Sequence, residues 1–295
     1  MSHRHNHSEH CTQHNATRIK WVLIITATYA VIQIVGGWLS GSLALIADSV
    51  HMFSDSAALL LALVAYRISR RKPDVKRSYG YDRVRVLAAL ANGSVLLAIT
   101  AWIIVEAISR ALNPLPILAT PMLIVACIGL LINLIGAFVL HGGHQHDQNL
   151  RGAFLHVLGD LLGSVGAIAA AIGIMYTGWT LLDPLLSVFV ALLIVHAAWR
   201  LVVDAVQVLL QASPTNVDAP TIEHAVQQLD GVAQAGHLHV WTLTDNVMVA
   251  TLHVTPKAGV DPLTLPAHVS HYLREHWGFT HITVQVDPPD GLTVH

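Results

Sequence analysis

Long apolar stretches alternate with short polar connectors through the first 210 residues of the chain. A helix that crosses a bilayer needs about 20 mostly apolar residues, and six stretches have that length. They are 21–39, 43–68, 84–112, 117–140, 153–176 and 181–210. The connectors carry turn residues, such as "SGS" after the first stretch and "NPLP" after the third. The pattern therefore predicts six membrane-spanning helices.

The pattern changes after Pro214, where polar residues appear and the apolar runs become short. Two amphipathic helical patterns alternate with three strand-like runs, "HLHVWTLTD", "VMVATLHVT" and "HITVQVD". The order α-β-β-α-β predicts a small α+β domain, ferredoxin-like or metallochaperone-like, with helices on one face of a sheet. We expect three regions: a His-rich tail at 1–19, a six-helix transmembrane domain at 20–212 and a C-terminal domain at 213–295.

The composition agrees with a membrane protein. Hydrophobic residues make up 54% of the chain and charged residues 12%, whereas soluble domains carry about 25% charged residues. The mean hydropathy is +0.56. A formal net charge of −2 gives no reason to expect nucleic acid as a partner. Cys11 and Cys127 lie in different kinds of segment and indicate no disulfide framework. The polar N-terminus does not have the pattern of a cleaved signal peptide.

Positive charge is concentrated between the second and third apolar stretches. Segment 67–85 holds eight Lys or Arg residues, whereas the connectors after the first and fifth stretches hold none. Because Lys and Arg accumulate on the cytoplasmic side, this loop is expected to be cytoplasmic. Six spans then place both termini and the His-rich loop 141–148 in the cytoplasm as well. We interpret the basic residues as signals for orientation and contacts with lipid headgroups, because positive charge would repel a cation substrate.

Two of the apolar stretches carry a His followed four positions later by an Asp. His51 and Asp55 lie in the second stretch, and His156 and Asp160 lie in the fifth. Residues four apart share one face of a helix, so the two helices can offer a four-ligand N2O2 site. Zinc favours this donor set, whereas magnesium and calcium favour six or more oxygens. A single membrane His is often a helix-packing hydrogen-bond partner, but paired ionisable groups at membrane depth usually mark an ion or proton pathway. We predict a metal transport site.

Asp48 precedes His51 by three positions and lies on nearly the same helix face. Two roles are open for this carboxylate. It either accepts a hydrogen bond that fixes a ligand imidazole, or it forms a hydrogen bond that packs two helices together.

The stretches "GSLALIADSVHMFSDS" and "LHVLGDLLGSVG", with the His-rich loop and "HLHVWTL", closely resemble the cation diffusion facilitator family, and within it the bacterial zinc exporters. The resemblance covers 21–287. It implies a homodimer in the bilayer of the bacterial inner membrane that exchanges cytosolic Zn2+ for H+. It also implies a C-terminal domain that regulates and dimerises, and no cofactor beyond Zn2+ itself as substrate. Related zinc transporters often also accept Cd2+.

In this family some members bind a second metal through a "HSFGH"-like stretch after the second helix. The matching residues here, 77–81, read "RSYGY", so that site is expected to be absent.

The resemblance also implies ligands in the cytoplasmic domain. They would be His237, His253 and Asp287, but Gln285 stands where the family has a further His. His239 is an alternative ligand, because residues two apart share a strand face. We therefore expect a weaker or differently built cytoplasmic site.

Histidines also cluster in two polar segments. Five lie in the N-terminal tail, and the loop contributes His141, His144 and His146. Such composition is typical of metal binding. The interpretation is weak, multi-site zinc capture; the alternative is a solvated segment without a defined site.

The mechanism follows from the competition between protons and metal for the same ligands. Imidazole titrates near pH 6.5, so it binds metal at a neutral cytoplasm and releases it to a more acidic exterior. Alternating exposure of one site then exports zinc. Exchange for two protons is electroneutral, and exchange for one moves charge against the membrane potential; both stoichiometries stay open.

Two other classes of protein fit the sequence less well. An intramembrane metallohydrolase needs an open coordination position and a general base, and the chain has no His-Glu-x-x-His motif. A membrane-anchored metal sensor would use the cytoplasmic histidines but would leave the intramembrane pairs without a role.

Overall fold

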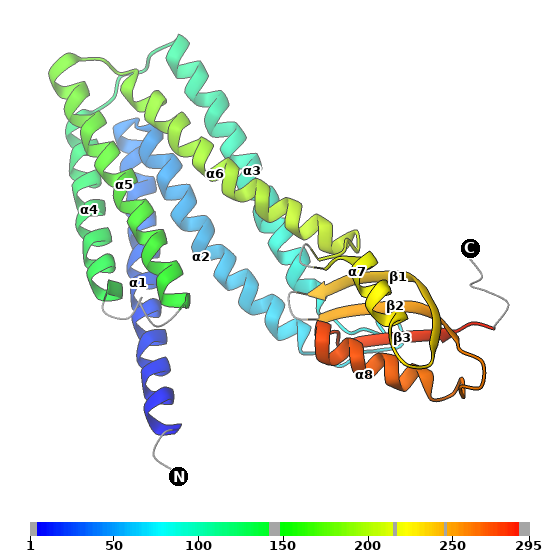
Figure 1. Ribbon diagram of the computed structural model, residues 1–295. Helices are drawn as coiled ribbons and strands as arrows, with labels where there is room; N and C mark the ends of the chain where they lie inside the picture. Colours follow the sequence, from blue (N-terminus) through cyan, green and yellow to red (C-terminus); the bar gives the residue numbers. More distant parts are fainter. Residues whose placement is uncertain (1–4, 142–147, 215–216, 245–246, 289–295) are drawn as a thin grey trace. The chain divides into compact units, whose positions relative to one another are not determined.

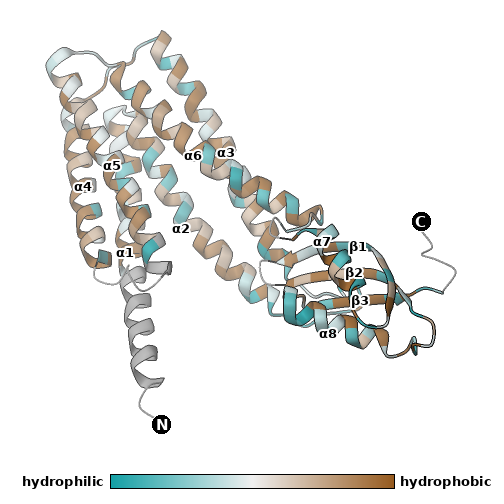
Figure 2. Cartoon of the chain, in the orientation of Figure 1, coloured by the Kyte–Doolittle hydropathy of each residue, from teal (hydrophilic) through white to brown (hydrophobic). Residues whose placement is uncertain are grey.

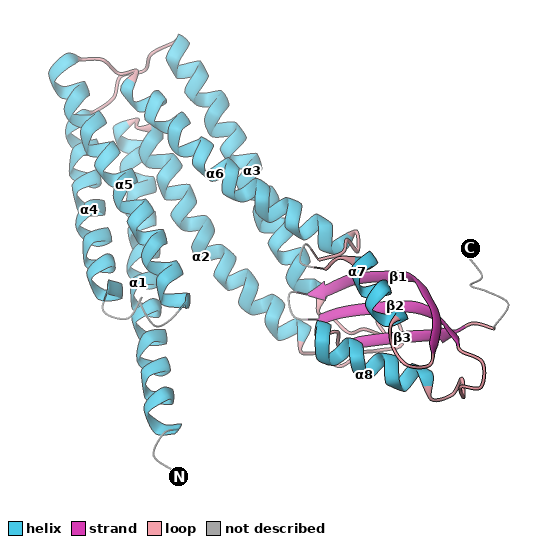
Figure 3. Cartoon of the chain, viewed as in Figure 1, coloured by secondary structure: helices cyan, strands magenta, loops and turns pink. Residues whose placement is uncertain are grey.

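The computed structural model describes residues 5–141, 148–214, 217–244 and 247–288. Six long helices precede a domain that contains a small sheet (Figures 1 and 3). The long helices are α1 (His5–Ser40), α2 (Leu43–Ser69), α3 (Arg83–Leu112), α4 (Ala119–His141), α5 (Gln148–Thr177) and α6 (Leu182–Leu209). Each contains an apolar window long enough to cross a bilayer. The six predicted spans are confirmed.

Helix α1 differs from the expectation at its start. It begins at His5, well before the apolar stretch that starts at Trp21. The intervening sequence contains neither Pro nor Gly, the two residues that disfavour helix interiors most strongly. The helix therefore extends into the segment predicted as a His-rich tail.

The long helices are largely hydrophobic, as their brown colour in Figure 2 shows, and many of their large apolar side chains are exposed. Trp38, Phe138 and Tyr176 are all more than three-quarters exposed. A lipid environment requires this pattern, because hydrocarbon cannot hydrogen-bond polar groups.

Helices α1, α4 and α5 lie side by side (Figure 1). Glycines allow α1 and α4 to approach closely, as small residues do at helix interfaces in membranes. A Cβ atom at Gly36 would lie 2.6 Å from Cγ2 of Val125, and one at Gly129 would clash with the hydroxyl of Tyr29. That hydroxyl donates a hydrogen bond of 2.8 Å to the carbonyl of Val125.

The contacts divide the described chain into two compact units. One contains the chain up to Leu61 together with Ala91–Arg200, and the other contains Ala62–Leu90 together with the chain from Leu201 onward.

The C-terminal domain has the predicted order of elements. They are α7 (Ala219–Gln227), β1 (Val232–Thr244), β2 (Val247–Pro256), α8 (Leu265–Trp277) and β3 (His281–Val286). Strand β1 pairs antiparallel with β2, and β2 pairs parallel with β3. Parallel neighbours need a crossover connection, and α8 supplies it. Ile222 and Val226 of α7 are buried with Val269 and Leu273 of α8 against strand residues such as Leu252. The α+β domain is confirmed.

Candidate metal centre

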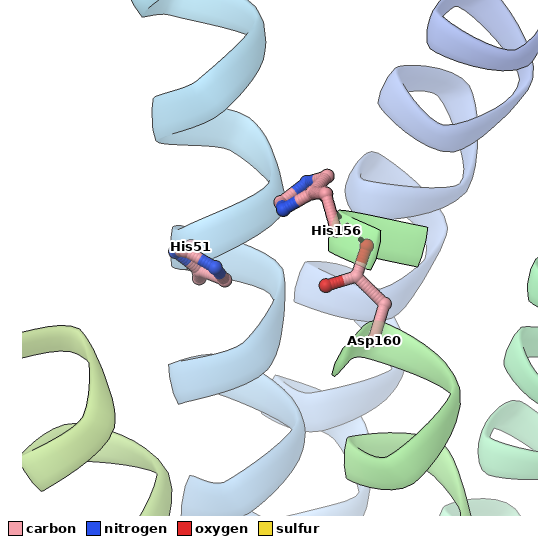
Figure 4. Close-up of side chains that lie close together, drawn as sticks. All are labelled: His51, His156 and Asp160. Carbon is pink, nitrogen blue, oxygen red and sulfur yellow. Dashed lines mark ion pairs between the residues drawn. The ribbon is translucent and has the colours of Figure 1, made fainter. Parts of the chain in front are cut away.

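Helices α2 and α5 bring together side chains that the sequence singled out. Figure 4 shows His51 from α2 pointing toward His156 and Asp160 from α5. One ligand atom from each of these three residues lies within 4.8 Å of the other two. Among the described residues, no other set of three or more His, Cys, Asp or Glu side chains meets this distance.

Asp55 approaches the same point from α2. Its Oδ2 atom lies 3.1 Å from Nε2 of His156 and 3.7 Å from Nε2 of His51. The Nε2 atom of His156 is also 3.6 Å from Oδ2 of Asp160. The two imidazole rings meet edge to face, with centroids 5.6 Å apart. Each helix thus contributes one nitrogen and one oxygen donor.

These separations can be compared with a tetrahedral zinc site. Ligand atoms bonded to one zinc at about 2.0–2.1 Å lie roughly 3.3 Å apart, close to the separations of 3.1–3.7 Å that are observed. The Oδ2 atom of Asp55 is buried and makes no aligned hydrogen bond with any described residue. A buried carboxylate oxygen without a hydrogen-bond donor is suited to a cation.

The four side chains differ in exposure. Asp160 is 4% exposed, whereas His51, Asp55 and His156 are 26%, 33% and 43% exposed. Asp160 is thus the most deeply buried of the four side chains. The other three side chains are partly exposed.

Buried polar side chains that were not predicted from the sequence surround these residues. Nε2 of Gln33 on α1 donates a hydrogen bond of 2.6 Å to Oδ2 of Asp48. Nδ2 of Asn133 on α4 donates one of 3.2 Å to Oγ of Ser164 on α5. Of the two roles considered for Asp48, the bond with Gln33 is the one that packs two helices together. The sequence shows these residues only as polar positions within apolar stretches, which does not identify their partners.

A second group of histidines lies in the C-terminal domain. The Nε2 atoms of His237 and His239 are 3.2 Å apart, and the ring of His237 lies 4.8 Å from that of His253. Nδ1 of His253 is 2.9 Å from Oδ2 of Asp287. The chain therefore places all four of the expected cytoplasmic side chains in a row of pairwise contacts.

The backbone near His237 is irregular. The pairing of β1 with β2 shifts register between Gly236 and His239, and His237 has a φ of 53°. Both histidines are exposed, and Leu238 between them is buried. The two imidazoles therefore lie on one face of the strand, as expected.

Gln285 has a different role from that of a ligand. Its Nε2 donates a hydrogen bond of 2.9 Å to Oδ1 of Asp287. This bond lowers the pKa of Asp287 below its usual range, and the contact with His253 lowers it by a smaller amount. The residue that replaces a family histidine thus orients the neighbouring carboxylate.

Of the predicted capture residues, His141 is the last residue of α4, and its ring lies 5.8 Å from that of Phe154. His144 and His146 lie outside the described residues.

The chain matches two family models along almost its whole length. Residues 19–210 match the cation efflux transmembrane domain, and residues 214–289 match the cytoplasmic domain of cation efflux proteins. The chain is 43% identical to zinc transporter ZitB of Pectobacterium atrosepticum over 97% of this chain and 89% of that protein. It is 42% identical to zinc transporter ZitB of Escherichia coli, over 100% of this chain and 96% of that protein. It is 36% identical to the cadmium, cobalt and zinc/H(+)-K(+) antiporter of Bacillus subtilis, over 96% of this chain and 91% of that protein.

Proposed function

The chain belongs to the cation efflux family, that of the cation diffusion facilitators, and we propose that it exports Zn2+ in exchange for H+. Other divalent transition metals, such as Cd2+, are further substrates. The single observation that carries the proposal is the meeting of His51, His156 and Asp160, with Asp55, between two membrane-capable helices. The relatives named as zinc transporters and as a zinc/proton antiporter support it.

The donor set supports zinc as the main substrate. Two imidazole nitrogens and two carboxylate oxygens suit tetrahedral Zn2+, whereas Mg2+ would keep several waters and prefer oxygen ligands. A site of this composition also accepts Cd2+, because imidazole suits several late divalent metals. We therefore assign His51, Asp55, His156 and Asp160 to binding of the transported ion.

The same side chains couple the ion to protons. Ligands must lose their protons before they bind metal, so zinc and protons exclude each other from these four groups. When the site faces the cytoplasm, neutral imidazoles bind zinc. When it faces a more acidic exterior, protons displace the metal, and the proton gradient makes the cycle directional.

A transporter explains the geometry better than a hydrolase does. A catalytic zinc keeps an open position for water, whereas the four side chains here can occupy all four positions of a tetrahedral ion. A membrane-anchored sensor would leave the intramembrane group without a role. The assignment is therefore a secondary antiporter without enzymatic chemistry.

We further propose a homodimer in the bacterial inner membrane with both termini in the cytoplasm. Segment 67–85, with its eight basic residues, supports this orientation. The match to the cytoplasmic domain of cation efflux proteins supports a C-terminal domain that dimerises and regulates. His237, His239, His253 and Asp287 would bind regulatory zinc there.

The test is metal flux in proteoliposomes that hold a zinc indicator and a pH indicator. The parent protein should move zinc and protons in opposite directions. His156→Ala and Asp160→Asn should abolish both signals. His196→Ala, which removes an exposed histidine of α6 outside the group, should leave both unchanged. Full zinc flux in the two site variants, or zinc flux without proton movement in the parent, would contradict the proposal.

A further inference from the structure

A cavity of about 230 Å3 lies where the segment between α2 and α3 meets the end of α6 and strand β1. Its lining includes Arg77, Tyr79, Asp82, Arg83, Gln211 and Trp241. All of these residues belong to the same compact unit. None of them takes part in the proposed transport site or in the cytoplasmic histidine group.

Two guanidinium groups line this cavity. Arg83 is the first residue of α3, and its buried Nε finds no hydrogen-bond acceptor among the described residues. Buried donors nearly always have a partner, so the guanidinium of Arg83 has hydrogen-bonding capacity that no described residue uses. Asp82 also lines the cavity, and with Arg77 the lining carries two positive charges against one negative.

Contacts around Arg77 hold its side chain in place before any ligand binds. Its Nη1 atom lies 3.3 Å from the hydroxyl of Tyr81 and 3.6 Å from Oδ2 of Asp74. Its guanidinium lies 4.8 Å from the centre of the Tyr81 ring. Tyr81 in turn donates a hydrogen bond of 2.6 Å to Asp74. Because the side chain is already ordered, less conformational entropy is lost on binding.

Gln211, which follows the end of α6, also lines the cavity. Its φ of 60° belongs to a helix C-cap, in which the backbone N–H groups of Gln211 and Ala212 donate to the carbonyls of Val208 and Gln207. Trp241 of β1 adds a large ring with one N–H donor, and a ring of this kind suits a boundary between water and lipid.

We propose that this cavity binds a phosphate group, supplied either by the headgroup of an anionic phospholipid or by free phosphate. The planar fork of arginine matches the oxygens of phosphate. The cavity also adjoins the N-terminus of the 30-residue helix α3, where the helix dipole favours an anion.

The position along the chain also fits a lipid source. Arg83 begins one membrane-capable helix, and Gln211 lies just beyond the end of another. Basic pockets at the cytoplasmic ends of spans bind anionic headgroups. Exposed residues such as Arg70 and Arg71 are explained by membrane orientation alone. Orientation does not explain a walled cavity with a buried, unpartnered donor.

The experiment measures lipid retention on the full-length protein by native mass spectrometry. The detergent-solubilised protein is mixed with phosphatidylglycerol or with phosphatidylcholine, and in a separate arm with inorganic phosphate. Arg83→Gln and Arg77→Gln should each weaken phosphate-group binding about tenfold, the effect of losing roughly 1.4 kcal/mol from a charge-assisted hydrogen bond. Lys76→Gln, an exposed residue of the same loop that does not line the cavity, is the matched control and should bind as the parent does.

The two arms distinguish the source of the phosphate group. If the arginine variants lose binding of phosphatidylglycerol selectively, the phosphate group comes from the lipid headgroup. If they lose binding of inorganic phosphate selectively, the ligand is the free ion. Arg83→Lys is a second variant for the case that Arg83→Gln does not fold. It keeps the positive charge but lacks the guanidinium fork, and it should also bind the phosphate group several-fold more weakly than the parent. Equal losses of binding in all variants, Lys76→Gln included, would mean that the positive charge of the whole loop attracts the anion without a defined site. That result would overturn the proposal. Unchanged binding in the arginine variants would also overturn it.

Discussion

The backbone N–H of Leu43 donates a hydrogen bond of 2.7 Å to Oδ2 of Asp183, 140 positions further along the chain. Ser42 and Ala44 donate to the other carboxylate oxygen, through the hydroxyl and the backbone N–H respectively. The first N–H groups of a helix have no partner within that helix. A side chain from α6 thus caps α2, the helix that carries His51 and Asp55.

This cap predicts that Asp183→Ala lowers the stability of the protein. Asp183 is fully buried, and its loss leaves two backbone donors and a hydroxyl without an acceptor. We expect a loss of about 2 kcal/mol or more, together with slower zinc flux because α2 loses its anchor. Thermal unfolding in detergent and proteoliposome flux measure the two effects. Asp204→Ala, an exposed change on the same helix, should alter neither. Matching behaviour of the two variants would refute the capping role.

Metal choice should depend on His51. His51→Asp converts the donor set from N2O2 to NO3 and removes a group that ordinarily titrates near pH 6.5 in favour of one that titrates near 3.9. Carboxylate-rich sites tolerate manganese and other harder ions better than imidazole sites do. We expect relaxed preference for zinc and a flatter dependence of flux on pH between about 6 and 7.5. Zinc, cadmium and manganese flux across that range tests this. If ion ranking and pH profile both stay as in the parent, His51 neither binds the ion nor carries the proton.

Close packing of α1 against α4 should be sensitive to one methyl group. In Gly129→Ala the new Cβ meets the hydroxyl of Tyr29, which is buried and bonded to Val125. We expect a loss of about 1–3 kcal/mol from overpacking, measured as a lower midpoint of thermal unfolding. Gly159→Ala is the control, because nothing lies within 4 Å of its added Cβ. It should be neutral or slightly stabilising, since alanine favours helix over glycine. Equal midpoints for the two variants would argue against the close contact.

The carboxylate of Asp287 predicts a pH dependence in the C-terminal domain. Its pKa is lower in the folded protein than usual, first because Gln285 donates to it and then because His253 does. A carboxyl group of this kind stabilises the fold above its unfolded pKa of about 3.9, and the contribution is lost as pH falls through the folded pKa. The stability difference between the parent and Asp287→Asn should thus be full near pH 6 and shrink as pH falls below about 3.9.

Hydrogen exchange of β3 amides, with chelator present, measures this difference. Glu275→Gln, an exposed change on α8, is the control and should show no such pH dependence. A difference between parent and Asp287→Asn that persists unchanged to pH 3 would show that the charge of Asp287 does not stabilise the domain.

The sequence predicted the helices well where one property of the sequence, such as the length of an apolar run, determines where a helix lies. Except at the starts of α1 and α5, the ends of the predicted spans fell within two residues of the observed helix ends, because an apolar run stops where the bilayer stops. The repeated His-x-x-x-Asp spacing singled out His51, Asp55, His156 and Asp160, which lie close together in the structure, because helix periodicity puts each pair on one face.

Contacts between distant parts of the chain could not be predicted in this way. Nothing local to Asp183 indicates that it bonds Leu43, and Asn133 gives no indication that its partner is Ser164. The cavity beside Arg83 could not be predicted either, because its walls come from segments that are adjacent only in the fold. Helix packing, which periodicity does not encode, decides all three.

The hydrogen bond between Gln33 and Asp48 joins two helices that only Gly41 and Ser42 separate along the chain. During synthesis, α1 and α2 reach the membrane before α4 and α5 exist. A carboxylate within a lone span disfavours insertion, by up to about 2.5–3.5 kcal/mol when it lies at the centre. Because its partner lies in the preceding helix, Asp48 can enter the bilayer within a hairpin that already satisfies it. We therefore expect Gln33 to aid co-translational insertion, and its replacement by leucine to reduce the amount of correctly integrated protein.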